Sequence, residues 1–336
     1  MADSVADIFR TAALDGRTVF VAGAIGLVGS AIVRALLAAS GQVRIVGAHR
    51  SAAGNFIDHE RVRYVQADLT TSVGCAAAVA GCDRAILAAA ATGGAAQARR
   101  EPWRQVTDNV VMDSLILEAL HAIGAKRTVY ISSASIYQEF AGAIREDELN
   151  LGKDPAPAYF GVGWAKRYIE KQCEFWHRSG GMEFAVVRAA NVYGPHAQFN
   201  PDNSNFVAAL IRKAVDRMDP FEVWGRLDVT RDVIYADDFA EAIVRMLVDD
   251  RPFETFNVGS EQRATVGDVV RLALQYANHT PAQIRCINEA ATTVAFRALD
   301  CGKARAALNW SARTSLEEGI RQTTQWWQAN KDSWLR

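Results

Sequence analysis

The sequence predicts an α/β fold in which a doubly wound parallel sheet is followed by a smaller C-terminal lobe. Short runs rich in β-branched residues alternate with longer stretches of helical apolar spacing, the pattern of successive βα units. The strand runs lack a clean alternation of apolar and polar residues, as expected when helices cover both faces of the sheet. Half of the 336 residues are apolar, enough for one large core and a second, smaller one.

The regular elements are predicted mainly in the first part of the chain. The strands span residues 18–22, 43–47, 62–66, 84–89, 128–132 and 184–188, and the helices span 29–39, 107–123 and 162–178. In the last two helices apolar side chains extend beyond a single stripe. A second buried contact such as a dimer interface would explain this pattern, and so would deep burial within one chain.

After about residue 191 the sequence becomes rich in turn signals, among them Gly194-Pro195, Asn200-Pro201 and Asp219-Pro220. We therefore predict a first domain over residues 1–190 with a returning segment near 226–255. Residues 191–225 and 256–336 would form the smaller, substrate-binding lobe.

Charge and hydropathy exclude two classes of partner. With 37 Lys and Arg against 38 Asp and Glu, the chain has no overall basic field that would draw it to nucleic acid or to an anionic membrane. The most apolar stretch, residues 19–33, is interrupted by glycines and closed by Arg34, so it falls short of the roughly 18 residues of a membrane span. We expect no nucleic-acid partner and no membrane partner.

The five cysteines are scattered and form no Cys-x-x-Cys pair, which disfavours a zinc site and a disulfide framework. Asp3 and Asp7 near the start are the reverse of the positively charged region of an export signal. We expect a cytoplasmic protein without a bound metal.

Three glycines mark a phosphate site. Gly23, Gly26 and Gly29 follow the first predicted strand and open the first predicted helix. Glycine permits the tight turn, lets backbone N–H groups approach a pyrophosphate and brings the helix close to the strand, and the helix N-terminus favours negative charge. The pattern predicts a Rossmann domain that binds a nicotinamide dinucleotide, with Ile25 and Leu27 of the same loop among the contacts. A glycine-rich turn without a ligand is the alternative.

The residues after the second strand bear on the choice of dinucleotide. Residues 47–51 read Gly-Ala-His-Arg-Ser and contain no acid to hold the ribose 2′-hydroxyl of NAD. Arg50 is suited to a 2′-phosphate and favours NADP, whereas a solvated Arg50 would leave NAD possible. The other predicted cofactor contacts are Asp68 and Leu69 after the third strand, and Ala88 and Ala90 after the fourth.

Further motifs follow in a fixed order along the chain. They are Ala67-Asp68-Leu69, Ser132-Ser133-Ala-Ser135-Ile-Tyr137, Asn191-Val-Tyr193-Gly194-Pro195, Arg231-Asp232-Val-Ile-Tyr235-Ala-Asp237-Asp238 and Asn257-Val-Gly259. With the glycine loop, they make nearly the whole chain resemble extended short-chain dehydrogenases that act on nucleotide sugars. Residues 19–23, Thr92-Gly93-Gly94, residues 191–196 and Val223-Trp224-Gly225 are most similar to the GDP-fucose synthases, NADPH-dependent epimerases and reductases of a 4-keto sugar.

The resemblance assigns roles to a helical segment and a strand end. Such enzymes typically carry Tyr-x-x-x-Lys, in which the tyrosine exchanges a proton with the sugar while the lysine binds the nicotinamide ribose and lowers the tyrosine pKa. Here Lys166 is present and Val162 replaces the tyrosine, so the usual acid/base group is missing. Ser133 is expected to hydrogen-bond a substrate carbonyl or hydroxyl with Lys166 nearby.

Two more positions depart from the fucose synthases, which pair a cysteine with a histidine for proton transfer beside the ketone. Ser135 falls at the cysteine position and Asn205 at the histidine position, and neither side chain titrates near neutral pH.

Tyr159 is a candidate for a displaced proton donor, because it lies three residues before Val162 and would share its helix face if the helix began early. Pro155 and Pro157 favour the alternative, a packing tyrosine in the turn that enters the helix.

In the second lobe Arg231 matches the family arginine that engages the nucleotide diphosphate, and Asn191 and Trp224 are expected to line the same pocket, although Trp224 is also compatible with a core position. The resemblance thus implies a homodimeric, NADP-dependent oxidoreductase and isomerase of a nucleotide-diphosphate sugar. The alternatives are an epimerase or dehydratase with a different proton donor, and an inactive binding protein that keeps the dinucleotide and nucleotide-sugar sites.

Overall fold

A computed structural model of the chain describes residues 9–51, 54–91, 101, 103–287 and 298–334. The motif Thr92-Gly93-Gly94 and the acidic residues Asp3 and Asp7 lie outside the described residues.

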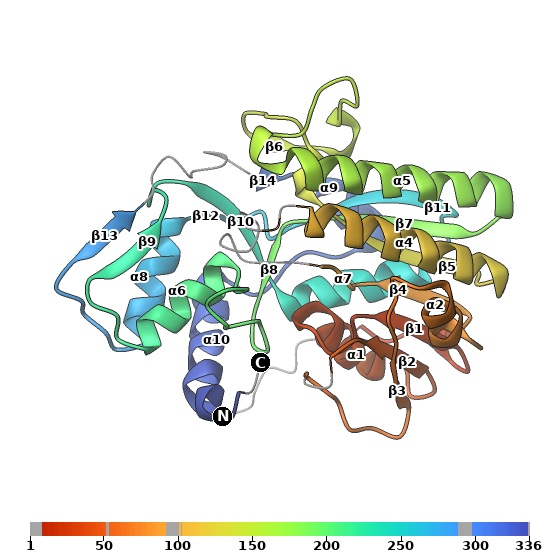
Figure 1. Ribbon diagram of the computed structural model, residues 1–336, viewed down its shortest axis with the longest axis horizontal. Helices are drawn as coiled ribbons and strands as arrows, with labels where there is room; N and C mark the ends of the chain where they lie inside the picture. Colours follow the sequence, from red (N-terminus) through yellow and green to blue (C-terminus); the bar gives the residue numbers. More distant parts are fainter. Residues whose placement is uncertain (1–8, 52–53, 92–100, 102, 288–297, 335–336) are drawn as a thin grey trace.

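A seven-stranded parallel sheet forms the centre of the larger lobe (Figure 1). In the order β11-β7-β5-β4-β1-β2-β3, its strands are Phe253–Val258, Glu183–Ala189, Arg127–Ser133, Arg84–Leu87, Thr18–Ala22, Arg44–His49 and Val62–Gln66. All six predicted strands are confirmed to within two residues at either end, and β11 is the one strand of this sheet that was not predicted. From β1 the chain continues to β2 and β3 on one side of β1, and it then returns to form β4 on the other side of β1. The direction in which successive strands are added therefore reverses between β1 and β4. This reversal is where α/β sheets bind ligands, outside the carboxyl ends of the strands.

Helices cover both faces of the sheet, which confirms the doubly wound fold (Figure 1). One face carries α1 (Leu27–Ala39) and α7 (Ala236–Val248), and the other carries α2 (Ser72–Val79), α4 (Arg104–Ala122) and α5 (Phe160–Gly180). The three predicted helices are therefore confirmed, each beginning two or three residues earlier than expected. The two apolar layers bury every central strand, which is why those strands read as continuous apolar runs.

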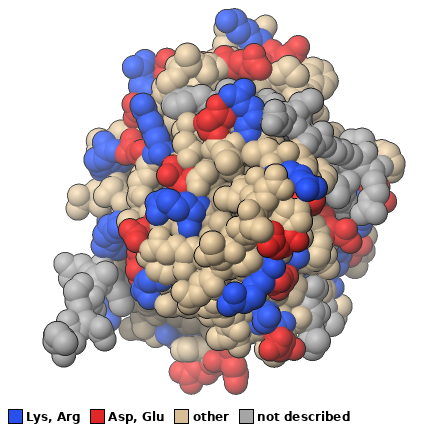
Figure 2. All heavy atoms as spheres, turned by 90° about the vertical axis from the view of Figure 1, so that its left-hand side faces the viewer, with Lys and Arg blue, Asp and Glu red and all other residues tan. Residues whose placement is uncertain are grey.

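A second lobe with its own apolar core lies at the left of Figure 1. It contains a three-stranded sheet of order β12-β10-β8 and a separate pair, β9 with β13. Its strands are β8 (Asn191–Tyr193), β9 (Phe221–Trp224), β10 (Thr230–Tyr235), β12 (Arg263–Thr265) and β13 (Ile284–Ile287), and its helices are α6 (Phe206–Val215), α8 (Val266–Tyr276) and α10 (Leu316–Asn330). Figure 2 shows basic and acidic side chains interspersed over the described residues of this lobe's outer face, without a large patch of one sign.

Short elements connect these parts. They are β6 (Ala143–Ile144), β14 (Ala298–Leu299), α9 (Gly302–Leu308) and the 3₁₀ turns η1 (Ala12–Leu14), η2 (Ala134–Ile136), η3 (Glu146–Glu148), η4 (Pro157–Tyr159) and η6 (Lys331–Ser333). All five cysteines lie in the described part of the chain and are unpaired. Within that part, no helix has both the length and the apolar character needed to cross a membrane.

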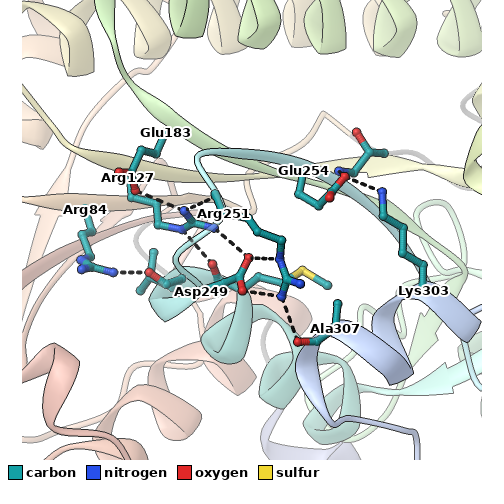
Figure 3. Close-up of polar contacts among 11 residues, drawn as sticks. Arg84, Arg127, Glu183, Asp249, Arg251, Glu254, Lys303 and Ala307 are labelled. Carbon is teal, nitrogen blue, oxygen red and sulfur yellow. Dashed lines mark hydrogen bonds and ion pairs between the residues drawn. The ribbon is translucent and has the colours of Figure 1, made fainter.

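A buried arginine stabilises the end of the large sheet at which its parallel strands begin (Figure 3). Arg127 of β5 is 1% exposed and donates to the carbonyls of Met246 and Arg251, each at 2.9 Å. Its guanidinium also lies 3.2 Å from the Glu183 carboxylate and 3.6 Å from that of Asp249. These contacts join β5 to the end of α7 and to the start of β7. Arg84 of β4 adds a further contact to the end of α7 by donating to the Leu247 carbonyl.

We predict that Arg127→Leu lowers the free energy of unfolding by about 3 kcal/mol, because it removes a buried partner from Asp249 and leaves two carbonyls without a donor. Urea unfolding measures the change. Arg145→Ala is the control, since the ion pair of Arg145 with Asp147 is exposed and contributes little to stability. Equal losses in the two variants would contradict the structural role of Arg127.

Candidate active site

The glycine loop between β1 and α1 is shaped by backbone contacts. Gly23 has a φ of 70°, and a Cβ there would lie 2.8 Å from the Cα of Ala89. A Cβ at Gly29 would lie 2.1 Å from the carbonyl oxygen of Gly23. Gly26 is the N-cap of α1 and makes no side-chain capping hydrogen bond, so the first N–H groups of the helix face the loop without a side-chain acceptor at that cap. This backbone cradle fits the pyrophosphate of a dinucleotide.

Two predicted contacts for the adenosine end lie at neighbouring strand ends. Arg50 follows β2 and Asp68 follows β3, and both are exposed. The hydroxyl and N–H of Thr70 donate to the Asp68 carboxylate and lower its pKa, and the nearby Arg50 adds a smaller effect in the same direction. Leu69 beside them is buried. Arg50 therefore stands within electrostatic range of Asp68 at the edge where the ribose is expected.

The loop after β2 is anchored to the glycine loop and to the second lobe. The Asn55 N–H donates to the carbonyl of Ile25 at 3.0 Å. The Asn55 amide donates to the His196 carbonyl at 3.1 Å, and its oxygen lies 3.0 Å from Nδ1 of His196. Ile25 is buried and Leu27 half-buried at the start of α1. The predicted cofactor contacts of this loop thus occupy fixed positions.

A buried asparagine holds the segment after β4. The Asn109 side chain of α4 accepts from the N–H of Ala91 at 2.7 Å and donates to its carbonyl at 3.1 Å. Ala88 is half-buried and Ala90 is exposed in this segment. The side chains of this segment are small and its backbone lies close to the glycine loop, since a Cβ at Gly23 would lie 2.8 Å from the Cα of Ala89. Asn109 was not identified from the sequence, although a polar residue on an apolar helix face is an available signal.

Ser133 is the last residue of β5, and Ser135 lies two residues later in η2. The Ser133 hydroxyl accepts from the N–H of Ser135 at 3.1 Å and caps η2. The Ser135 hydroxyl is buried and has no hydrogen-bond partner among the described residues. A Cβ at Gly163 would lie 2.6 Å from the Ser135 carbonyl, so the first turn of α5 packs directly on this turn. Val162, which precedes Gly163 in this first turn of α5, is half-buried.

Lys166 is largely buried and makes contacts on two elements. Its Nζ donates to the Ile131 carbonyl at 3.2 Å and lies 3.5 Å from a carboxylate oxygen of Asp113. The same Nζ is 4.7 Å from the centre of the Tyr130 ring. Asp113 was missed in the sequence, where its signal is an acid on the buried stripe of a predicted helix.

Tyr159 and Arg231 come from different lobes and interact. Tyr159 is half-buried at the end of η4, immediately before α5, so it belongs to the turn that enters the helix. Burial lowers the pKa of Arg231 on β10, and the nearby Tyr159 opposes that change. The phenol and the guanidinium are therefore close enough to interact electrostatically.

A small cavity of about 40 Å³ lies where the two lobes meet. It is lined by Ser133, Ala134, Ala189, Ala190, Asn191, Asp232, Ala298 and Leu299. Asp232 accepts from the N–H and hydroxyl of Ser260, and burial raises the pKa of its carboxyl. The structure thus brings the predicted residues Ser133 and Asn191 together.

Asn205 and Trp224 do not line this cavity. Asn205 is the N-cap of α6, where its side chain accepts from the Ala208 N–H at 3.0 Å and donates to the Val192 carbonyl at 3.3 Å. Trp224 is 45% exposed at the end of β9, which is not a core position. Among the described residues, no cluster of three or more His, Cys, Asp or Glu side chains could hold a metal ion.

Residues 19–259 match the NAD dependent epimerase/dehydratase family. The GDP-L-fucose synthase of Escherichia coli strain K12 is 28% identical over 329 residues, covering 94% of this chain and 97% of that protein. The enzyme of the same name from Sinorhizobium fredii is 27% identical and covers 91% and 94%. The GDP-mannose 3,5-epimerase of Arabidopsis thaliana is 26% identical and covers 77% and 68%.

Solved structures share the fold at low identity. The UDP-glucose 4-epimerase of Thermotoga maritima, determined with UDP-glucose, has a TM-score of 0.83 at 22% identity and covers 94% of this chain and 99% of that one. The UDP-glucose 4-epimerase of Thermus thermophilus, determined with NAD, has a TM-score of 0.78 at 22% identity and covers 92% and 98%.

We predict that Gly26→Val abolishes dinucleotide binding without unfolding the chain. The φ of Gly26 is −79°, which any residue adopts, and a Cβ there meets only the Gly23 carbonyl oxygen, at 3.3 Å, but the larger side chain would fill the space before the helix N-terminus. Calorimetric titration measures binding and circular dichroism the fold. Gly41→Ala, in open space, is the control. Retained binding in Gly26→Val would contradict the phosphate-loop assignment.

Proposed function

Because the chain belongs to the NAD dependent epimerase/dehydratase family, we propose that it is an NAD(P)-dependent nucleotide-sugar epimerase and reductase that acts through a 4-keto sugar nucleotide, as its fucose-synthase relatives suggest. The observation that carries the proposal is the meeting of Ser133 with Asp232 of strand β10 at one cavity. Lys166 donates to Ile131, two residues before Ser133, and Arg231 precedes Asp232 on β10. A dinucleotide on the glycine loop and a nucleotide sugar between the lobes would meet at this place.

The proposed roles divide among four side chains. A bound nicotinamide supplies the hydride chemistry of such a reaction. Arg231 binds the diphosphate with its forked guanidinium, and the Ser133 hydroxyl donates to the sugar oxygen that gains negative charge. Lys166 binds the cofactor ribose. Tyr159 holds the proton that the sugar oxygen receives, because its phenol precedes α5 and is close enough to Arg231 of β10 for the two to interact electrostatically.

We assign the dinucleotide to residues 1–190 with the returning segment near 226–255, and the nucleotide sugar to residues 191–225 and 256–336, with one exception. Strand β10 of the returning segment lies in the sheet of the second lobe and carries Arg231. Helix α7 and strand β11 of the returning segment support this division, because α7 packs in the core under α1 and β11 pairs with β7. Asn191, Asn205 and Trp224 are proposed substrate contacts on the second lobe.

NADP is the proposed cofactor. Arg50 is exposed at the carboxyl end of β2, where the ribose of the adenosine is expected, and residues 47–51 offer no acid to a 2′-hydroxyl. An arginine is suited to a phosphate at this position.

Arg50→Ala should weaken NADPH binding about ten- to hundredfold and change NADH binding little, because only the former loses a charged hydrogen-bond partner. Calorimetric titration with both cofactors checks this. Arg44→Ala, an exposed arginine at the other end of β2, is the matched control. Equal losses for the two cofactors would remove the basis for NADP.

Tyr159→Phe should reduce turnover about 10²- to 10⁴-fold while the affinities for cofactor and nucleotide sugar change little, because the variant keeps the ring and loses the exchangeable proton. Steady-state kinetics and calorimetry provide the two readouts. Tyr276→Phe on α8, whose hydroxyl donates to Glu317 and does not line the cavity, is the control. Unchanged turnover in Tyr159→Phe would exclude this hydroxyl as the donor.

The function itself is tested by titrating the protein with NADPH, NADH and a panel of GDP-, UDP-, dTDP- and CDP-sugars, and by following NADPH oxidation with 4-keto sugar nucleotides. Sugar-dependent oxidation supports a reductase. A change of sugar configuration without net oxidation supports an epimerase with another donor, and loss of water from the sugar without net oxidation supports a dehydratase. Val162 favours a second candidate, an inactive binding protein. Tight binding of both ligands without any turnover would establish that candidate and reject the enzyme.

We also propose a homodimer through the outer faces of α4 and α5. Val111, Tyr168 and Phe175 on these helices are 38%, 53% and 57% exposed, so burial within one chain does not account for them. A second copy covering both helices would remove this apolar surface from water. Light scattering of the purified protein tests the proposal, which a monomer mass would contradict.

A cytoplasmic location is proposed from the thiols. Cys75, Cys82, Cys173 and Cys301 are buried and unpaired, as is expected in a reducing compartment. Fractionation of the cells that make the protein tests this, and recovery outside the cytoplasm would contradict it.

A further inference from the structure

An acid lies inside the large lobe at a place that the proposed reaction does not use. Asp113 is on α4, its side chain is 2% exposed, and it packs against the sheet together with apolar residues of the same helix. Its carboxylate accepts from the Tyr130 hydroxyl at 3.1 Å and lies 3.5 Å from Nζ of Lys166. Burial raises the pKa of Asp113, and Lys166 and Tyr130 act against that change. A buried acid of this kind is kept only where it is paired.

The ammonium of Lys166 is held from two sides. Nζ donates to the Ile131 carbonyl at 3.2 Å and lies over the Tyr130 ring, while Asp113 approaches it from α4. The side chain is 10% exposed, so little water reaches it. Asp113 therefore fixes where the ammonium lies.

The other ionisable groups facing this pair leave its charge balance unchanged. Glu170 of α5 acts on Tyr130 electrostatically, but it is paired with Arg188 at 2.9 Å and accepts the Ser132 hydroxyl at 2.6 Å. Burial raises the pKa of the Cys173 thiol well above its usual value, which keeps the thiol neutral. Lys166 and Asp113 thus form one cation and one anion that match.

The pairing of Lys166 with Asp113 determines the electrostatic field at position 162. Val162 is four residues before Lys166 on α5, so the two share a helix face. An unpaired ammonium there would strongly stabilise an ionised group at position 162, whereas a close ion pair has a weak field beyond its own length. Valine at this position carries no charge, which agrees with the weak field expected from the ion pair of Lys166 with Asp113.

We propose that Asp113 is a positioning residue that fixes Lys166 and cancels its charge, so that this wall of the cleft binds the cofactor and does not activate a proton donor. Proton transfer is thereby left to Tyr159, which precedes the first turn of α5 and interacts with Arg231 of β10. This last step rests on the proposed function, whereas the cancellation of charge does not.

The test places a titratable reporter at position 162. Val162→Tyr is made with and without Asp113→Asn, and ionisation of the added phenol is followed by its ultraviolet difference spectrum against the parent protein. We expect an ordinary phenol titration, near pH 10, when Asp113 is present, and a titration at least about one pH unit lower, tenfold in the acid constant, when Asp113 is neutral. A smaller difference overturns the proposal.

A second comparison covers the case in which Asp113→Asn does not fold. Val162→Tyr/Asp113→Leu/Lys166→Met removes the whole pair and leaves no buried charge behind, a replacement that proteins often tolerate. The phenol should then titrate within about one pH unit of its value in Val162→Tyr, and a rise larger than that would show that Lys166 acts on position 162 despite Asp113. Both readouts are independent of substrate, so a failure of the proposed function through lack of turnover would be distinguishable from a failure of this inference.

Discussion

The close approach of the backbone at Gly23 to Ala89 is the constraint on which the site depends. A Cβ at residue 23 would lie 2.8 Å from the Cα of Ala89, and one at Gly29 would lie 2.1 Å from the Gly23 carbonyl oxygen. The first contact keeps the loop against the segment after β4, at the reversal of strand order, and the second keeps α1 against the loop. The N-terminus of α1 is thereby aimed along the carboxyl edge of the sheet. The anion site is consequently made of backbone, and the side chains of the cleft remain available for the substrate.

A continuous network of polar side chains connects β5, α5, β7 and β11 near the carboxyl ends of these strands. Ser132 donates to Glu170, which pairs with Arg188; Arg188 donates to the Tyr137 hydroxyl, and Tyr137 donates to Asn257 at 2.7 Å. The chain of contacts crosses from β5 to α5, β7 and β11. Each charge in it has a partner, so a break at any point would leave a buried polar group unmatched. This network fixes the end of β5, which carries Ser133, and helix α5, which carries Lys166.

What could be predicted from the sequence follows the range of the interactions. The glycine loop and the central strands are encoded locally, by backbone requirements and by burial on both faces, and the structure confirms their places. Strand β11, at the edge of the sheet, reads Phe-Glu-Thr-Phe-Asn-Val and mixes polar with apolar residues, so no apolar run marked it. The pairing of Lys166 with Asp113 could not be read at all, because it depends on how α4 and α5 pack over one strand. Tyr159 lies between these cases: the sequence placed it at the helix entrance, and only the fold brings it to Arg231.

Lys166 and Arg231, the two cations of the proposed site, differ in how strongly they would attract a further anion. Lys166 is paired with Asp113, whereas Arg231 is a half-buried guanidinium whose pKa is lowered by burial, and an anion that approached it would act against that effect. In the proposed reaction two anions would do so, the substrate diphosphate and the ionised phenol of Tyr159. A guanidinium has five donors in a planar fork and can hold both, but each reduces the attraction left for the other. In the proposed reaction a diphosphate on Arg231 would oppose early loss of the Tyr159 proton, and the same guanidinium would favour its transfer once the sugar oxygen becomes negative. Binding of the nucleotide and transfer of the proton are in this way coupled through one side chain of the second lobe.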